Sequence, residues 1–399
     1  MSFAMTTPTH PTSAPRSTAQ LASMALALGL ALLIHTGAAQ GQLQTSTGSP
    51  WTLGLVLDAS AATRDIELGA RQKGLQLGHS DLTAAGGLGR HLHAQITAVA
   101  ATHEGRLEHG IEEAWVESRT LPWGLNLRGG RFASQISALN AQHPHSDDFS
   151  ERPLMYRAFL GQHWTDDGLR LNLTLPTPVY WMIGLEAFRG RRLLEDTDLP
   201  SRGLGAHTLS TRLGGDLDRS NSWQLGLGLL HNRHMASPDE HHEGAAEESK
   251  DHAPHGAWFT GRRTHWVDAT WKWAPAGNNR NEQIRLTFEL AQITDIAAQA
   301  PARLRHRAQT LSAVWRFHPN WEVGLRSDRL HAYAQHEGEC EARRLSELSA
   351  MLAWKPSHLQ TLRLQWSRQS DLIGFESEPN NRLMLQYILS FGHHGAHAY

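Results

Sequence analysis

Hydrophobic and polar residues alternate one by one along most of the chain from residue 51 onward. Between Leu169 and Leu175, four leucines alternate with Arg170, Asn172 and Thr174. A period of two residues indicates a β-strand whose two faces have different surroundings, because successive side chains point to opposite sides. The pattern therefore predicts an all-β protein. The same alternation recurs at 51–58, 223–229, 267–273, 284–290, 311–317, 321–326, 362–367 and 383–391.

Two kinds of structure contain such strands. In a soluble sandwich the apolar face is buried, whereas in a transmembrane barrel it faces lipid and the polar face surrounds a wet interior. Segments of about ten residues, and an opposite face rich in Arg, Glu, Asp and Gln, favour the barrel. We predict a transmembrane antiparallel β-barrel of about 14 to 16 strands. Tryptophans near strand ends are typical of its interfacial girdles, and they are Trp51, Trp223, Trp273, Trp321, Trp354 and Trp366.

The N-terminal segment has the parts of a secretory signal peptide. Arg16 precedes the apolar run Leu21–Ile34, and small residues follow at 37–39. The run is too short for a stable transmembrane helix, which needs about 20 apolar residues. A basic region, a short apolar run and a small-residue exit mark a segment removed after export. We predict a signal peptide over 1–39 and one barrel domain over 40–399.

The predicted strands are joined by connections of two kinds. Short turns containing Pro, Asn and Ser occur at 319–320 and 355–358, whereas 131–165 and 231–262 are long. Transmembrane barrels have short periplasmic turns and longer extracellular loops. We expect 231–262 to be a His-rich extracellular loop, and 131–165 is a candidate constriction loop that folds into the barrel. Because alternation starts at residue 51, no plug domain is predicted.

Composition excludes several classes of function. The formal net charge is −2, so the chain has no overall basic field for nucleic acid. The single cysteine, Cys340, allows neither an internal disulfide nor a cysteine-based zinc site. No G-x-S-x-G, H-E-x-x-H or P-loop motif occurs, so no enzymatic activity is predicted. The unusual feature is the count of 26 histidines.

Two stretches of the chain resemble a known family. One is GIEEAWVESRTLPWGLNLRGGRFASQISALNAQHPHSDDFSERPLMYRAFLG at 110–161, and the other is NRLMLQYILSFGHHGAHAY at 381–399. They are similar to proteobacterial plug-less outer-membrane β-barrel proteins described as zinc-associated or TonB-receptor-like, which resemble phosphate-selective porins. The resemblance implies a porin-like barrel in the outer membrane of a Gram-negative bacterium. It also implies an association with metal supply.

Three groups of residues offer candidate metal ligands, because neutral imidazole and carboxylate both ligate zinc. The first group lies in the acidic segment 231–255 and contains His231, His234, His241, His242, His252 and His255. The second lies in the candidate constriction loop and contains His143, His145 and Asp147, beside Asp148. The third lies in the C-terminal tail 392–399 and contains His393, His394 and His397. The alternative for each group is a solvated segment that holds no ion.

Arginines on the polar strand face support a different interpretation. Guanidinium groups match phosphate and carboxylate geometry, and a ring of them inside a channel selects anions. Pairing of each arginine with a neighbouring carboxylate would cancel that preference. The candidate lumen residues are Arg128, Arg170, Arg285, Arg326 and Arg363.

The sequence thus predicts an outer-membrane, porin-like protein that passes or captures small hydrophilic solutes. Divalent metal, zinc in particular, is the favoured solute, and no cofactor is required beyond Zn²⁺ as a bound or transported ion. Two alternatives stay open: a general or anion-selective porin with incidental histidines, and a structural barrel with a blocked lumen. The expected partners are outer-membrane lipid, small solutes or metal ions, and further copies of the chain, but no nucleic acid.

Overall fold

The structure of the protein is a computed structural model. It describes residues 51–103, 105–190, 193, 203–233, 257–297, 300–336, 339–375 and 380–392. The predicted signal peptide at 1–39 and the tail residues 393–399 lie outside the described residues.

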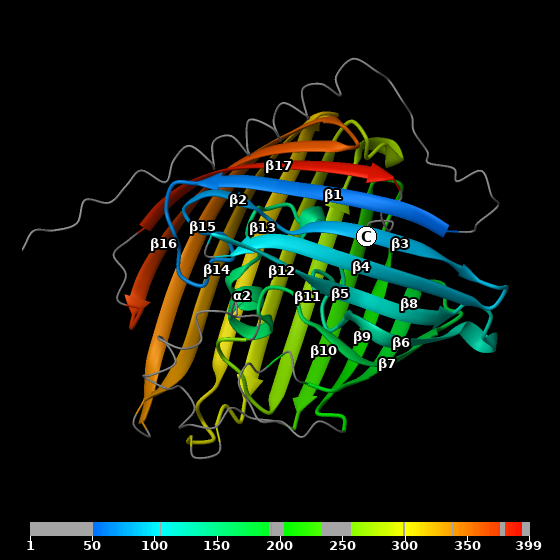
Figure 1. The fold of residues 1–399 in the computed structure, drawn as a ribbon, viewed down its shortest axis with the longest axis horizontal. Helices are drawn as coiled ribbons and strands as arrows, with labels where there is room; N and C mark the ends of the chain where they lie inside the picture. The colour runs from blue at the N-terminus through cyan, green and yellow to red at the C-terminus, as the bar shows by residue number, and fades with distance from the viewer. Residues whose placement is uncertain are drawn as a thin grey trace, which may run out of the picture. The chain divides into compact units, whose positions relative to one another are not determined.

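The described residues form one antiparallel sheet that closes on itself (Figure 1). β1 closes the ring by pairing with β17 on one side and with β2 and β3 on the other. Because β2 and β3 are two parts of one interrupted strand, the barrel has 16 strands, which confirms the predicted fold class. The strands are β1 (Trp51–Ala62), β2 (Gly74–Leu77), β3 (Ser80–Leu88), β4 (Leu92–His103), β5 (Arg106–Ser118), β6 (Leu125–Ala133), β7 (Thr165–Thr174), β8 (Tyr180–Phe188), β9 (Ala206–Asp216), β10 (Asn221–Asn232), β11 (Arg263–Trp273), β12 (Gln283–Thr294), β13 (His306–His318), β14 (Trp321–His336), β15 (Glu339–Ser357), β16 (Gln360–Ile373) and β17 (Asn380–Gly392).

The outer face of the barrel is apolar and much of the inner face is polar. Leu227 and Leu286 point outward and are 44% and 40% exposed, whereas the inward-facing Asp268 and Glu289 are 2% and 3% exposed. This arrangement suits a wall between lipid and a polar interior. No helix within the described residues is long and apolar enough to cross a membrane. An aromatic girdle follows the end of the barrel where the turns are short, and its tryptophans are Trp51, Trp181, Trp223, Trp273, Trp321 and Trp354.

The longest described connection enters the barrel. It is the loop 134–164, which joins β6 to β7 at the end opposite the aromatic girdle. The loop contains a short 3₁₀ turn, η3 (Pro144–Ser146), and a helix, α2 (Leu154–Leu160), which lies inside the ring of strands (Figure 1). Two further 3₁₀ turns, η2 (Pro122–Gly124) and η4 (Pro275–Gly277), belong to short connections at the girdle end. All seven residues of α2 are buried.

The hydrophobic core of the protein therefore lies inside the barrel, around α2. Its wall residues come from β5, from β6 and from every strand between β8 and β15, which together make up more than half of the ring. The expectation of a polar inner face holds only in part, because some of the wall residues that pack around the loop are apolar. A helix of apolar residues needs apolar contacts to be buried. The wall side chains in this core include Phe188, Trp266, Ile293, Leu330 and Leu345.

Candidate functional site

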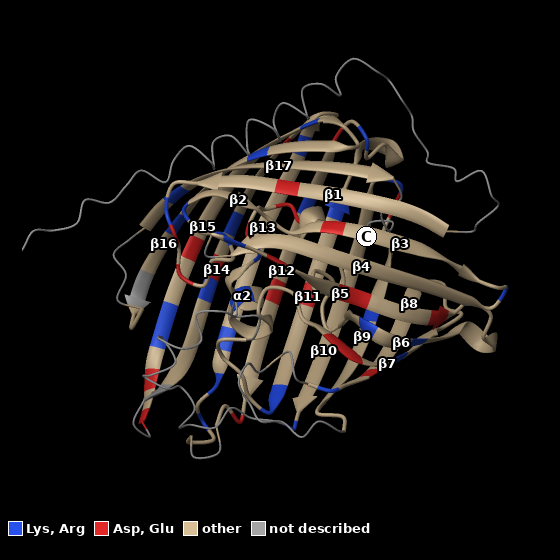
Figure 2. Ribbon diagram, in the orientation of Figure 1, with Lys and Arg blue, Asp and Glu red and all other residues tan. Residues whose placement is uncertain are grey.

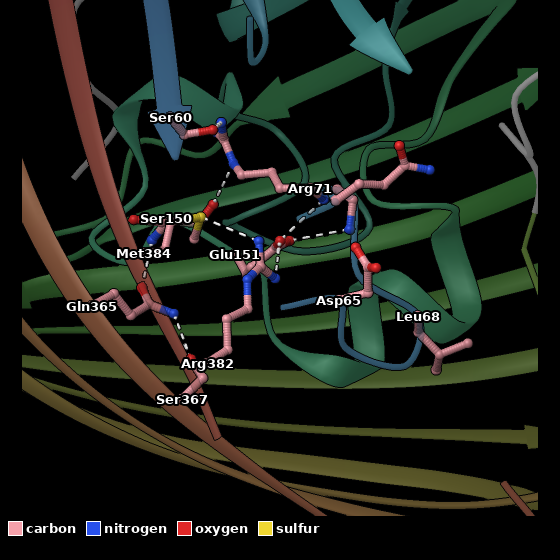
Figure 3. A network of polar contacts seen from close by, with 12 residues as sticks. Ser60, Asp65, Leu68, Arg71, Ser150, Glu151, Gln365, Ser367, Arg382 and Met384 are labelled. Carbon is pink, nitrogen blue, oxygen red and sulfur yellow. Dashed lines mark hydrogen bonds and ion pairs between the residues drawn. The ribbon is translucent and has the colours of Figure 1, made fainter. Parts of the chain in front are cut away.

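Loop 134–164 is fixed inside the barrel by buried ion pairs, and the first of these centres on Glu151 (Figure 3). Nη1 of Arg382, on β17, donates to Oε1 of Glu151 at 2.9 Å. The backbone N–H of Arg71 donates to the same oxygen at 3.1 Å. The Arg71 side chain then donates from Nε to the carbonyl of Ser150 at 3.0 Å and pairs with Asp58 of β1 at 2.5 Å. The loop is thus tied both to the wall and to the connection between β1 and β2.

The second ion pair fixes α2. Arg157 is fully buried and pairs through Nη2 with Oε2 of Glu347, on β15, at 2.6 Å. Arg326, on β14, reaches the other Glu347 oxygen at 2.8 Å and donates from Nη1 to the backbone carbonyl of Glu151 at 2.5 Å. Removing one partner of a buried pair costs about 3–5 kcal/mol, because a charge is left uncompensated. The position of the helix therefore depends on wall residues nearly two hundred positions away.

Each of the five arginines predicted to face the lumen has an acceptor on the wall or on loop 134–164. Arg128 pairs with Glu117 at 2.6 Å, Arg170 with Glu186 at 2.6 Å, and Arg285 with Asp148 of the loop. Arg326 is held by Glu347 as described, and Arg363 donates to Gln386 at 2.5 Å and to the Asp147 carbonyl at 2.6 Å. Basic and acidic positions are interspersed on the strands (Figure 2). A carboxylate compensates the charge of four of these arginines, whereas Arg363 donates to two neutral acceptors.

A β-bulge in β5 places two consecutive glutamates on the inner face. Thr97 of β4 pairs with Glu113, but Ala98 pairs with Ile111, so Glu112 is an extra residue in β5. A bulge re-aims side chains that would otherwise alternate. Glu112 and Glu113 are therefore both buried inside the barrel, at 7% and 5% exposure.

The break between β2 and β3 brings further ligand-type side chains to the same part of the wall. Ala59 of β1 pairs with Leu77, and Val56 pairs with Asp81, so three steps along β1 oppose four steps along β2 and β3. His79, in this break, lies with Nε2 at 3.1 Å from Oε2 of Glu112. Asp81 is buried at 4% exposure.

The loop adds two histidines to this wall. His143 and His145 flank Pro144 of η3, and their rings stack at 5.7 Å with an interplanar angle of 16°. Nδ1 of His145 lies 3.1 Å from Oδ2 of Asp81. Nδ1 of His143 lies 3.6 Å from the same oxygen and 3.2 Å from Oε2 of Glu112, while its Nε2 lies 3.3 Å from Glu113. The loop therefore meets the wall through imidazole and carboxylate groups.

His163, which follows α2, completes the arrangement. Its Nδ1 lies 2.9 Å from Oε1 of Glu112, and its Nε2 lies 2.9 Å from the Asn140 carbonyl. Burial lowers the pKa of His163 despite the nearby Glu112. Burial would also lower the pKa of His143, but its contacts with Glu112 and Glu113 outweigh that effect and raise the pKa well above the ordinary value. We call the group the His–carboxylate cluster, and it consists of His79, Asp81, Glu112, Glu113, His143, His145 and His163.

Part of this cluster has the composition and spacing of a metal site. One ligand atom each from His79, Asp81 and His143 lies within 4.8 Å of the other two. Two imidazoles and a carboxylate form an ordinary ligand set for zinc. Within the described residues, this is the set of histidine and acidic side chains that converges closely enough to hold an ion.

The other predicted metal ligands have different positions. Asp147 does not join His143 and His145, because it pairs with Arg152 at 2.8 Å. His231 lies near the end of β10, paired in register with His207 and Arg263. The remaining candidates lie outside the described residues, and they are His234, His241, His242, His252, His255, His393, His394 and His397.

Sequence reasoning missed five members of the cluster: His79, Asp81, Glu112, Glu113 and His163. One signal was available for two of them. Glu112 and Glu113 are adjacent in a segment that otherwise alternates, and two acids in a row cannot both face the interior of a regular strand. Such a pair indicates a bulge. No comparable signal marks the other three.

Comparisons with known proteins agree with this architecture. No family model matches the chain. An uncharacterized protein of Aquifex aeolicus is 24% identical over 313 residues, which are 72% of this chain and 63% of that protein, so the chain spans less than two thirds of this relative's length. Among solved structures, Pseudomonas putida OprB at high pH has a TM-score of 0.55 at 14% identity, covering 86% of this chain and 94% of that one.

Two further solved structures show the same fold. The anion-selective porin from Comamonas acidovorans has a TM-score of 0.51 at 12% identity, covering 86% of this chain and 100% of that one. The trimer form of OmpT, an outer-membrane protein of Vibrio cholerae, has a TM-score of 0.53 at 8% identity, covering 86% and 99%. The fold is thus that of porin barrels. Its apolar outer face suits a wall in contact with lipid, in agreement with the predicted location in the outer membrane of a Gram-negative bacterium.

Proposed function

We propose that this protein is a non-enzymatic, passive outer-membrane channel for small hydrophilic solutes. The observation that carries the proposal is loop 134–164, which enters the barrel and is held there through Glu151 and Arg157. A loop fixed inside a barrel narrows the passage, and the width and polarity of the narrowest part decide which solutes pass.

We propose weak selectivity between ions of opposite charge. The support is the pairing of the inward-facing arginines with carboxylate, amide or carbonyl oxygens. A paired guanidinium has less residual charge to attract an anion than a free one. A general porin is therefore favoured over an anion-selective one.

We also propose a divalent metal ion, Zn²⁺ in particular, as a favoured solute. The support is the His–carboxylate cluster on the inner wall, where imidazoles and acids lie together beside the loop. Acidic groups attract cations, and imidazole favours zinc over alkali metals.

A second candidate, a structural barrel with a blocked lumen, is supported by the core around α2. Apolar side chains from β8 and from β14 and β15, on distant parts of the ring, belong to one hydrophobic cluster with this helix. If this core closes the interior entirely, no solute passes.

The experiment is single-channel recording of the purified full-length protein in planar lipid bilayers. A channel gives discrete current steps, and a salt gradient gives a reversal potential near zero for weak selectivity. Current carried by Zn²⁺ in place of a monovalent cation tests the metal proposal. His358→Ala, at an exposed turn, is the matched control for His143→Ala, which should reduce the zinc current. Absence of steps under all conditions would establish the blocked barrel instead.

The trimer form of one structural neighbour leads us to propose a homo-oligomer for this chain as well. Chemical cross-linking of the detergent-solubilised protein tests it. Ladder bands above the monomer support the proposal, and a single monomer band contradicts it.

A further inference from the structure

We propose that His79, Asp81 and His143 bind one divalent transition-metal ion, such as Zn²⁺, which joins loop 134–164 to the barrel wall. This site would fix the loop whether or not zinc is the transported solute. The inference rests on the proposed function in one respect: the loop that the metal would hold is the proposed constriction of the channel.

The first argument is the position of the ligand atoms. The three atoms lie within 4.8 Å of one another, and two of them come from the wall while the third comes from the loop. Zinc–nitrogen bonds of about 2.1 Å place two ligands of one ion at most about 4.2 Å apart. Nδ1 of His143 on the loop and Oδ2 of Asp81 on the wall, at 3.6 Å, already lie within that limit.

The second argument is a set of buried polar atoms that lack hydrogen-bond partners. They are Oδ2 of Asp81, Nδ1 of His143 and Nδ1 of His145. The two nitrogens lie 3.6 and 3.1 Å from the Asp81 oxygen, yet none of the contacts has hydrogen-bond geometry. Buried polar atoms are almost always paired. A bound cation would satisfy the Asp81 oxygen and the His143 nitrogen at once, with His145 beside them as a further ligand.

The third argument is the carboxylate behind each imidazole. Oε2 of Glu112 lies 3.1 Å from Nε2 of His79, and Oε2 of Glu113 lies 3.3 Å from Nε2 of His143. Histidines that ligate zinc through one nitrogen usually donate the other N–H to a carboxylate, which orients the ring and increases its basicity. The wall therefore supplies an outer shell of carboxylates, and for His143 the contact of Nε2 with Glu113 leaves Nδ1, beside Asp81, as the coordinating atom.

Charge and access complete the case. Asp81, Glu112 and Glu113 are three buried carboxylates in one small volume, and such a group needs cationic compensation. The His79 and His143 side chains keep 20% and 22% of their surface exposed. The cluster is therefore only partly enclosed, although the ligand atoms of Asp81 and His143 are buried.

The test is metal binding by the refolded full-length protein and four variants. Asp81→Asn and His143→Ala remove ligands, while Asp216→Asn and His358→Ala are matched controls at exposed positions. Equilibrium dialysis against Zn²⁺ gives the stoichiometry, and the visible absorption of bound Co²⁺ reports nitrogen and oxygen coordination. Histidines outside the described residues contribute equally in all five proteins, so the differences isolate this site.

We expect the wild type and both controls to bind one more equivalent than Asp81→Asn and His143→Ala. An additional variant outside this set, Glu113→Gln, should retain the site but weaken it about 10- to 100-fold. Equal stoichiometry in all folded proteins would overturn the proposal. Folding is checked by the change of gel mobility on boiling, and Asp81→Asn, which keeps the size of the side chain, decides the matter if His143→Ala does not fold. If a variant loses one equivalent of bound Zn²⁺ but keeps its conductance, the metal site is supported independently of the channel proposal. If the wild type binds this Zn²⁺ but shows no conductance, the channel proposal fails and the metal site is still supported.

Discussion

Replacing Glu347 with glutamine should release loop 134–164 from the barrel wall. Glu347 is 2% exposed and accepts from Arg157 of α2 at 2.6 Å and from Arg326 of β14 at 2.8 Å. The amide removes the only full negative charge that Arg157 contacts at this distance among the described residues. It also turns one of the two acceptor oxygens into a donor.

The magnitude follows from the burial of the partners. An uncompensated buried charge costs about 3–5 kcal/mol. Arg326 keeps a second partner in Asp328 at 2.8 Å, so the cost falls mainly on Arg157, and we take the lower end, about 3 kcal/mol. Since each 1.4 kcal/mol changes an equilibrium about tenfold, the population of undocked loop rises roughly 100-fold. The barrel itself should persist, because its wall is held by continuous strand pairing.

The assay is single-channel conductance together with limited proteolysis of the loop. Glu347→Gln should show larger or more frequently fluctuating current steps and faster cleavage between residues 134 and 164. Glu322→Gln is the matched control, since Glu322 is 4% exposed and pairs with Arg316 at 2.5 Å and Lys355 at 2.6 Å, both on barrel strands. Conductance and cleavage identical to wild type in Glu347→Gln, or an equal increase in Glu322→Gln, would refute the reasoning.

Three further predictions concern the membrane face, the histidine-rich segment and the N-terminus. Leu227→Arg and Leu286→Arg should each destabilise the barrel by up to about 2–4 kcal/mol, because the arginine would face lipid. Gln365→Arg should also impair folding, because the loop fills the space beside Gln365. Urea titration of the refolded proteins measures all three effects, and midpoints equal to that of the wild type would contradict the predictions. Deletion of 236–255 should reduce loose zinc binding near neutral pH, with little difference well below about pH 6.5 where imidazole is protonated, and equal binding at neutral pH would show that the segment holds no metal. Mass spectrometry of protein extracted from membranes should find a chain beginning after Ala39, and a chain that retains 1–39 would rule out the signal peptide.

The sequence by itself determined the barrel. Each strand contacts lipid on one side, so its outward positions within the membrane must be apolar. This requirement produces an alternation that is visible within a few residues of one strand. Leu227 and Leu286 are therefore assigned to the outer face by their neighbours alone. The long connection containing His143 is likewise visible as a break in alternation.

Only the tertiary structure decided what fills the barrel. The backbone N–H of Ser150 donates to Oε1 of Gln365 at 2.7 Å, across a separation of 215 residues. Nη2 of Arg157 donates to Oε2 of Glu347 at 2.6 Å, across a separation of 190 residues. Inside the barrel a side chain faces the loop or the opposite wall rather than one uniform solvent, so polarity alone cannot assign its partner. Glu112 joins the His–carboxylate cluster because a bulge in β5 changes the direction of its side chain, and that bulge is defined by pairing with β4. Local alternation records the environment of a strand face, whereas the candidate site depends on which distant residues the closed sheet and the inserted loop bring together.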